Sequence, residues 1–403
     1  MSFRRYWPWA LLSLLLLAFI VYQVPEVKQR VDWRVGGAVA YVLNWLDPVG
    51  ALPAPEVINS SIAPSEAPTL TPHPATATPQ FTATPLPASV QMAAPAHEFQ
   101  GPNNCGPATL AMYLRYYGWE GDQYDISDEI KPESADRNVN VDELIYYARN
   151  WAGWLKSTFR VGGTIDLLKD FLAAGIPVMI EEGEIILNQG PNDDNWAAHY
   201  ILLTGYDEAT RSFAYQDSFR GEGRVKTYDE IDEYWQQFNR VYILVYLPDQ
   251  EETVKSILGE DWDEDTNRQN ALEMAQLETN DDPQNAYAWF NLGMNQVYFG
   301  QYSAAAASFD QARTIGLPMR MLRYQFGPFF AYYNTNRMED LVQLIDYALE
   351  VTPNSEDVLL WRGWVFYKEG DLNAAIQQFR LAQAENPKSF YVEQALISVG
   401  ATP

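Results

Sequence analysis

The stretch QGPNNCGPATLAMYLRYYGW, residues 100–119, contains the only cysteine in a chain of 403 residues. Cys105 follows loop-forming glycine, proline and asparagine residues and precedes apolar residues with helical spacing. Pro107 suits the first turn of a helix, where its missing N–H group costs nothing. The thiol is therefore predicted at a helix N-terminus, where unpaired N–H groups and the helix dipole favour a thiolate. This position indicates a reactive cysteine, because a structural cysteine usually lies within an apolar run.

A nucleophilic thiol needs a general base, and the base needs a third group to orient it. Of the three histidines, His73 lies in a proline-rich segment and His97 at the edge of that segment, so His199 is the better base. His199 begins a strand-like run that ends in a turn at 207–211, and Asp217 follows on the returning strand. An even pairing register would place that carboxylate beside the imidazole. On local grounds alone, His199 could equally be a core residue and Asp217 a strand-end acid.

Taken together, these blocks resemble the papain-like cysteine peptidases related to the bacteriocin-processing, double-glycine proteases. The resemblance covers about residues 97–247, and its most specific part is the Asn-Cys-Gly-Pro block that opens a helix. HYILLTGYD and YQDS supply the rest. The resemblance implies a papain-like α+β domain with four site residues: Cys105 as nucleophile, His199 as base, Asp217 as orienting acid and Gln100 as oxyanion donor.

Two positions depart from the family pattern. The glutamine of the bacteriocin-processing members usually stands one residue further from the cysteine than Gln100 does here. The usual Asp-Pro pair appears as Asp217-Ser218, which keeps the acid and changes the following turn. The ABC-transporter parts of the bacteriocin-processing members are absent from this sequence, so specificity for double-glycine leaders is not carried over.

The N-terminal part of the chain indicates a membrane attachment. Arg4 and Arg5 precede 19 uncharged residues, and about 20 apolar residues span a bilayer as a helix. Residues 1–25 are therefore predicted as an anchor with its N-terminus inside, and a cleaved signal peptide is the alternative. Residues 26–47 are predicted as a juxtamembrane amphipathic stretch. Residues 48–96 hold eleven of the 25 prolines among Ala, Thr and Ser, which predicts a disordered stalk.

Residues 97–248 show the patterns of a compact domain. Helices are predicted at 106–117, 140–152, 164–174 and 227–238, and strands at 176–182, 199–206, 212–217 and 240–247. Early helices followed by strands that read as an antiparallel meander indicate an α+β domain, because a doubly wound sheet needs alternating strands and helices.

Residues 249–403 contain a repeat of helical patterns. Ala348 and Pro353 precede Ala382 and Pro387 by 34 residues each. This part resembles the tetratricopeptide family, whose 34-residue helix–turn–helix units have small residues where helices cross closely. The resemblance implies an all-α solenoid, and an unrelated helical bundle is the alternative. The whole chain is thus predicted to be multidomain.

The overall composition argues against some classes of partner and site. A net charge of −26 disfavours nucleic acid as a partner. One cysteine excludes an intrachain disulfide, and no Cys/His spacing fits structural zinc, so neither a cofactor nor a metal is expected.

We expect a cysteine peptidase of the bacterial cell membrane, crossing the membrane once, with its catalytic and repeat domains outside the cytoplasm. It would cleave a peptide or protein, and the repeats would bind the substrate or a protein partner. Two alternatives stay open: an inactive papain-like domain that serves protein interaction, and thiol-dependent acyl transfer on a non-protein amide.

Overall fold

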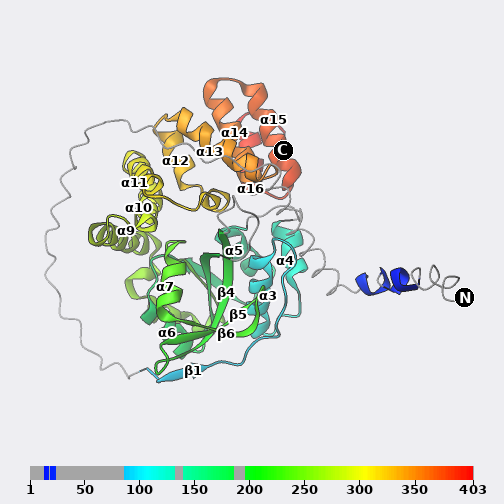
Figure 1. Cartoon of the computed structure of the whole chain (residues 1–403), viewed down its shortest axis with the longest axis vertical. Coiled ribbons are helices and arrows are strands. Elements are labelled where there is room, and N and C mark those ends of the chain that lie inside the picture. Colours follow the sequence, from blue (N-terminus) through cyan, green and yellow to red (C-terminus); the bar gives the residue numbers. More distant parts are fainter. Residues whose placement is uncertain (1–12, 18, 24–85, 132–138, 186–195, 403) are drawn as a thin grey trace, which may run out of the picture.

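The computed structural model describes residues 13–17, 19–23, 86–131, 139–185 and 196–402 (Figure 1). Residues 86–247 hold a seven-stranded antiparallel sheet with helices on both faces, and helices follow to the C-terminus. The predicted juxtamembrane stretch and residues 48–85 of the predicted stalk lie outside the described residues. Within the described part of the chain, no helix combines the length and the apolar character that crossing a membrane requires.

In the first domain, helices come mainly before a meander of antiparallel strands. Its elements are β1 (Ser89–Gln91), α3 (Cys105–Tyr116), α4 (Gln123–Ile130), α5 (Val141–Asn150), β2 (Lys156–Arg160), α6 (Ile165–Ala173), β3 (Val178–Ile185), β4 (Trp196–Asp207), β5 (Ser212–Asp217), β6 (Gly221–Thr227), α7 (Tyr228–Gln236) and β7 (Tyr242–Tyr246). The strands are ordered β2-β7-β3-β4-β5-β6, and β1 pairs with the far end of β4. The predicted α+β class of this domain is confirmed.

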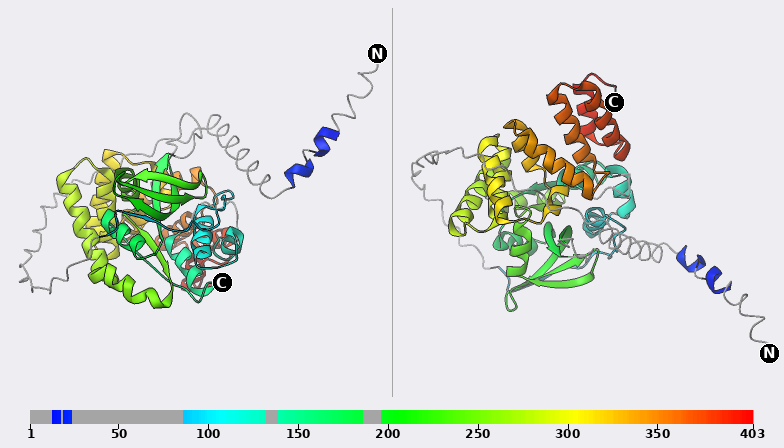
Figure 2. Two further views of the ribbon diagram at one scale, coloured as in Figure 1. Left: turned by 90° about the horizontal axis from the view of Figure 1, so that it is seen from below. Right: turned by 45° about the horizontal axis from the view of Figure 1, so that its top comes forward.

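Each face of the sheet is covered by its own helices, because side chains alternate between the two faces along a strand. Tyr200 and Leu202 of β4 belong to a core with α3, α4 and α5. Ile201 and Leu203 of the same strand belong to a core with α6 and α7 on the other face. The views in Figure 2 show these helices on either side of the sheet. β4 is thus central and contributes to both cores.

The structure corrects the end of the predicted stalk. Val90 of β1 pairs with Tyr206 of β4, and Met92 is buried, so the domain begins before residue 97. The sheet has room for β1 because Gly205 has no side chain: a Cβ there would lie 2.4 Å from the Val90 carbonyl oxygen. The composition of this segment indicated disorder, whereas the pairing depends on a partner strand more than 100 residues away.

Besides β1, three elements of the domain were not predicted. α4 is largely polar, with only Ile126 and Ile130 as buried apolar residues, so its helical pattern is weak. β6 carries two glycines and is mostly exposed, and β2 is short and partly exposed. Strands of this kind are defined by their neighbours in the sheet and lack a strong pattern of their own.

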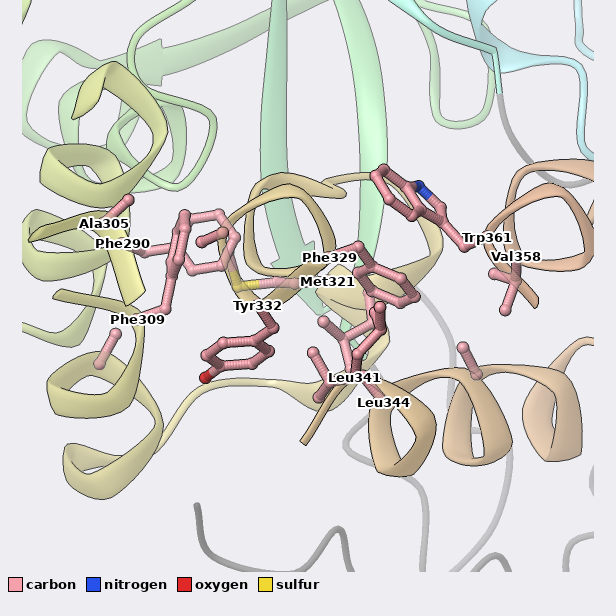
Figure 3. Close-up of a cluster of buried hydrophobic side chains, with 14 of the residues drawn as sticks. Phe290, Ala305, Phe309, Met321, Phe329, Tyr332, Leu341, Leu344, Val358 and Trp361 are labelled. Carbon is pink, nitrogen blue, oxygen red and sulfur yellow. The ribbon is translucent and has the colours of Figure 1, made fainter. Parts of the chain in front are cut away.

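The C-terminal region is helical throughout its described residues, as predicted. Its helices are α8 (Glu251–Leu258), α9 (Glu264–Asp281), α10 (Ala286–Tyr298), α11 (Tyr302–Ile315), α12 (Gly327–Asn334), α13 (Met338–Val351), α14 (Glu356–Glu369), α15 (Leu372–Glu385) and α16 (Phe390–Ser398), with the short 3-10 helix η3 (Met319–Arg323) before α12. Figure 3 shows a core that joins α10 and α11 to α12, α13 and α14 through Phe309, Phe329 and Trp361. Membership of the tetratricopeptide family stays a prediction.

Small residues lie where these helices pack most closely. A Cβ added to Gly293 of α10 would lie 2.6 Å from the Phe309 ring of α11. Likewise, a Cβ on Gly363 of α14 would lie 2.3 Å from the Phe379 ring of α15. Four alanines of α11 and α15 are fully buried: Ala305, Ala312, Ala375 and Ala382. Glycine and alanine thus make room for one phenylalanine in each helix pair.

We expect Ala375→Leu to destabilise the helical region by about 1–3 kcal/mol, because extra methyl groups in a filled core force neighbours from their rotamers. Gln377→Leu, at an exposed position of the same helix, is the matched control. Chemical unfolding followed by circular dichroism measures both variants. Equal midpoints for the two variants would show that the space around Ala375 is not filled.

The helical region contacts the sheet domain at both of its ends. Near its start, Asn291 Nδ2 donates to Gln236 O at 2.7 Å, and Asn239 Nδ2 donates to Asn295 Oδ1 at 2.8 Å. At the turn between α15 and α16, Lys388 Nζ donates to Asp128 O at 2.8 Å, on α4. Figure 1 shows the helices curving from the α7 side of the sheet domain to the α4 side. The two parts are therefore joined by more than the connecting chain.

Candidate active site

Cys105 is the first residue of α3 and is partly exposed. The start of α3 is packed tightly against β4. Thr109 Oγ1 donates to Tyr200 O at 3.0 Å, and a Cβ on Gly106 would lie 3.4 Å from the Tyr200 ring. The N-terminus of α3 is thereby held against the residue that follows His199. The first N–H groups of a helix have no partner within the helix, and Cys105 lies at this end of α3.

His199 and Asp217 meet through the pairing of β4 with β5. Ile201 pairs directly with Asp217, so the even register expected from the sequence is present. His199 Nε2 lies 2.8 Å from Asp217 Oδ1, and both side chains are buried. The same carboxylate accepts from the main-chain N–H groups of Phe219 at 2.7 Å and Arg220 at 2.9 Å. Asp217 is therefore held rigidly while it faces the imidazole.

The Cys105 thiol and the His199 imidazole lie close enough for each to shift the pKa of the other. Because Nε2 of His199 faces Asp217, the other ring nitrogen is left for Cys105. The chain Cys105–His199–Asp217 thus joins residues that are 112 positions apart in the sequence. It crosses from the start of α3 to the start of β4 and the end of β5.

The electrostatic environment favours a charged thiolate and imidazolium. Burial alone would raise the pKa of the Cys105 thiol, but the His199 imidazole, the Tyr200 N–H group and the charge of Lys131 lower it overall. Burial alone would lower the pKa of His199, whereas the Asp217 carboxylate and Cys105 raise it to about 10. Burial likewise opposes ionisation of Asp217, yet His199 and the two N–H donors lower its pKa. Each charge is stabilised by its neighbour.

Gln100 is fixed to the strand end that carries Asp217. Its main-chain N–H group donates to Ser218 O at 2.8 Å, and its Oε1 accepts from Ser218 Oγ at 2.9 Å. Because the amide oxygen accepts this bond, its NH₂ group remains as the donor end. The serine that replaces the family's proline therefore supplies the hydroxyl that orients Gln100.

Two residues of the site were not predicted. His97 Nε2 lies 2.9 Å from the main-chain oxygen of Asp217, so it supports the orienting acid. Gln123 of α4 accepts from Gly101 N at 2.6 Å and from Asn104 Nδ2 at 2.9 Å, which ties down the loop before Cys105. Neither role leaves a signal in the sequence, since each depends on contacts between segments 19 to 120 residues apart.

Comparison with known proteins finds a family similarity in the sheet domain. Residues 84–245 match the model of the Peptidase_C39 like family. The match begins before β1, in agreement with the earlier start of the domain. No curated protein matches the chain.

Several solved structures resemble this part of the chain. One is described as a C39-like peptidase from Bacillus anthracis (19% identity, 40% of this chain, 97% of that chain, TM-score 0.32). Another is a double glycine motif protease from an AMS/PCAT transporter in complex with the leader peptide (18%, 39% and 94%, TM-score 0.30). A third is xylellain, a cysteine protease from Xylella fastidiosa (16%, 40% and 87%, TM-score 0.30). Such low identities say nothing about the bond that this chain would cleave.

Proposed function

We propose that the protein, whose residues 84–245 match the model of the Peptidase_C39 like family, is a cysteine peptidase that hydrolyses peptide bonds with Cys105 as the nucleophile. The observation that carries the proposal is the continuous chain from the Cys105 thiol through the His199 imidazole to the buried Asp217 carboxylate. A nucleophile, a base and an orienting acid within hydrogen-bond reach are the parts that covalent catalysis requires.

The geometry supports a two-step reaction. The Cys105 thiolate attacks the carbonyl carbon of the scissile bond, and the carbonyl oxygen takes the negative charge. The Cys105 N–H group and the Gln100 amide are the candidate donors to that oxygen, each worth roughly 3 kcal/mol in comparable sites. His199 then gives its proton to the leaving amine, which departs and leaves a thioester on Cys105. Water, which gives a proton to His199, then attacks the thioester, releases the acid product and restores the Cys105 thiolate beside the His199 imidazolium.

Labelling of the full-length chain with an electrophilic thiol probe tests the nucleophile. Because Cys105 is the only cysteine, any thiol adduct detected by mass spectrometry lies on it. We expect rapid labelling at neutral pH that is lost when urea unfolds the protein. Labelling no faster in the native chain than in urea would contradict the proposal, because the fold would then add nothing to the thiol.

We also propose that residues 1–25 anchor the protein in a bacterial membrane with the catalytic domain outside the cytoplasm. The support is the pair Arg4 and Arg5 followed by the uncharged run in the sequence. Protease added to intact cells is expected to release a soluble fragment that begins between residue 48 and β1, since β1 is protected by its pairing with β4. Recovery of the whole chain from the cytosol, intact after this treatment, would overturn the anchor.

The helical region is proposed to bind the substrate or a protein partner. Its position supports this role: Arg320 Nη1 of η3 donates to Trp196 O at 3.1 Å, three residues before His199 on β4. Gln325 Nε2 donates to Gln237 O at 2.9 Å nearby. A polypeptide that reaches the site from this end of β4 would pass beside the helices.

A further inference from the structure

The loop that presents Cys105 contains a backbone conformation that needs support. Asn103, two residues before the thiol, has a φ angle of 54°. This is the left-handed region, where a Cβ is crowded and which asparagine adopts more often than other residues but less freely than glycine. Such a conformation persists only where surrounding contacts hold it, and it is often found at functional sites.

A buried lysine holds this residue in place. Lys131 directly follows α4 and is 3% exposed. Its Nζ donates to the main-chain oxygen of Asn103 at 2.7 Å. The contact fixes the peptide group between Asn103 and Asn104, and the next peptide group carries the N–H of Cys105. The contact of Lys131 thus lies one peptide group away from the Cys105 N–H group.

The position of Lys131 is fixed from two sides. Its own main-chain N–H group donates to Ser127 O at 2.8 Å, within α4. The helical region holds the residue before it, since Asn386 Nδ2 donates to Ile130 O at 3.4 Å. Lys388 adds a bond to Glu129 at 2.9 Å. The end of α4 thus contacts the loop before Cys105 on one side and the turn that joins α15 and α16 on the other.

We propose that Lys131 is a positioning residue for the nucleophile: by holding Asn103 in the left-handed conformation, it aims the Cys105 N–H group at the oxyanion. The inference rests on the proposed function, because it concerns the same thiol. Lys131 also contributes positive charge near the thiolate, which helps to lower the pKa of Cys105. Its direct contact with the loop before Cys105 is the hydrogen bond to Asn103 O.

Two reagents separate aiming of the N–H group from activation of the thiol. Iodoacetamide alkylates a thiolate without forming an oxyanion, whereas p-nitrophenyl acetate acylates it through a tetrahedral oxyanion. In the full-length chain, we expect Lys131→Met to slow acylation at least tenfold more than alkylation. Lys131→Arg, which keeps a charged donor, should retain more of the acylation rate than Lys131→Met.

A second change tests the role of the backbone. Glycine adopts the left-handed region without crowding, so Asn103→Gly introduced into Lys131→Met should recover part of the lost acylation rate. A merely structural lysine would lower both rates by the same factor, and this result would overturn the proposal. So would unchanged rates, or failure of the glycine to recover acylation. If thermal unfolding shows that Lys131→Met does not fold, Lys131→Gln replaces it in the same comparison.

The reactivity of the wild-type chain with the two reagents tests the proposed function separately. A wild-type chain that reacts with neither reagent would contradict the peptidase function itself. A reactive wild type with no selective loss in the Lys131 variants would contradict only the positioning role.

Discussion

Replacing Cys105 with alanine is expected to abolish peptide hydrolysis, with a loss of at least about 10³-fold. Nucleophile removal in comparable enzymes has effects of this size or larger, because neither base nor acid can then form the covalent intermediate. The chain contains no second thiol that could substitute. The full-length protein is incubated with a library of peptides, and newly formed termini are identified by mass spectrometry. Termini that form with the wild type should be missing with Cys105→Ala.

Measurements of folding show whether Cys105→Ala loses activity through the missing thiol or through a disturbed structure. Cys105 lies at the start of α3 and is only partly buried, so the alanine is not expected to disturb the core. Circular dichroism and thermal unfolding should therefore match those of the wild type. Equal cleavage by both proteins would show that the activity comes from elsewhere, and the assignment of the nucleophile would be wrong.

Replacing His199 with alanine is expected to slow alkylation of Cys105 by iodoacetamide about tenfold or more at pH 7. The rate of alkylation follows the fraction of thiolate. In the wild type, His199 helps to bring the pKa of the thiol below its ordinary value, so the rate should rise at lower pH than for a free thiol. Without the imidazole, fewer groups counteract the effect of burial on the thiol, so the pKa of Cys105 should rise. The alkylation rate of His199→Ala should then rise at a higher pH than that of the wild type.

Asp217→Asn gives an intermediate comparison. The amide retains a hydrogen-bonding oxygen near His199 but removes the negative charge that raises the pKa of the imidazole. We expect its rate–pH curve to lie between those of the wild type and His199→Ala. Curves that coincide for all three proteins would contradict the coupling of Cys105 to His199. Because His199 and Asp217 are buried, unfolding midpoints measured at each pH confirm that the variants remain native.

Much of the candidate site could be predicted from the local sequence. Loop-forming residues, Cys105 and Pro107 together determine a helix start, since these preferences act within a single turn. The strand-like run HYILLTGY and the turn after it predict β4 and β5, and with them the proximity of His199 and Asp217. These inferences succeed because the interactions behind them are short-range. The resemblance to a peptidase family added the pairing with Cys105.

The supporting residues could not be predicted in this way. α4 lacks a strong apolar pattern, so neither Gln123 nor Lys131 stood out, although both hold the loop before the thiol. His97 looked like the end of a stalk, and its contact with Asp217 O spans 120 residues. β1 was likewise hidden by a composition typical of disorder. Each of these features depends on long-range packing that leaves no periodic pattern.

The sequence by itself determined a thiol at a helix N-terminus, an imidazole and a carboxylate on paired strands, and a helical C-terminal region. Hydrophobic spacing and turn chemistry are local, so these elements follow from neighbouring residues. Only the tertiary structure decided that Cys105 meets His199, that Ser218 orients Gln100, and that the helical region holds the end of α4. Those contacts join residues 94 to 256 positions apart, which the packing of the cores brings together. Their geometry arises from packing of whole elements, which no short stretch of sequence contains.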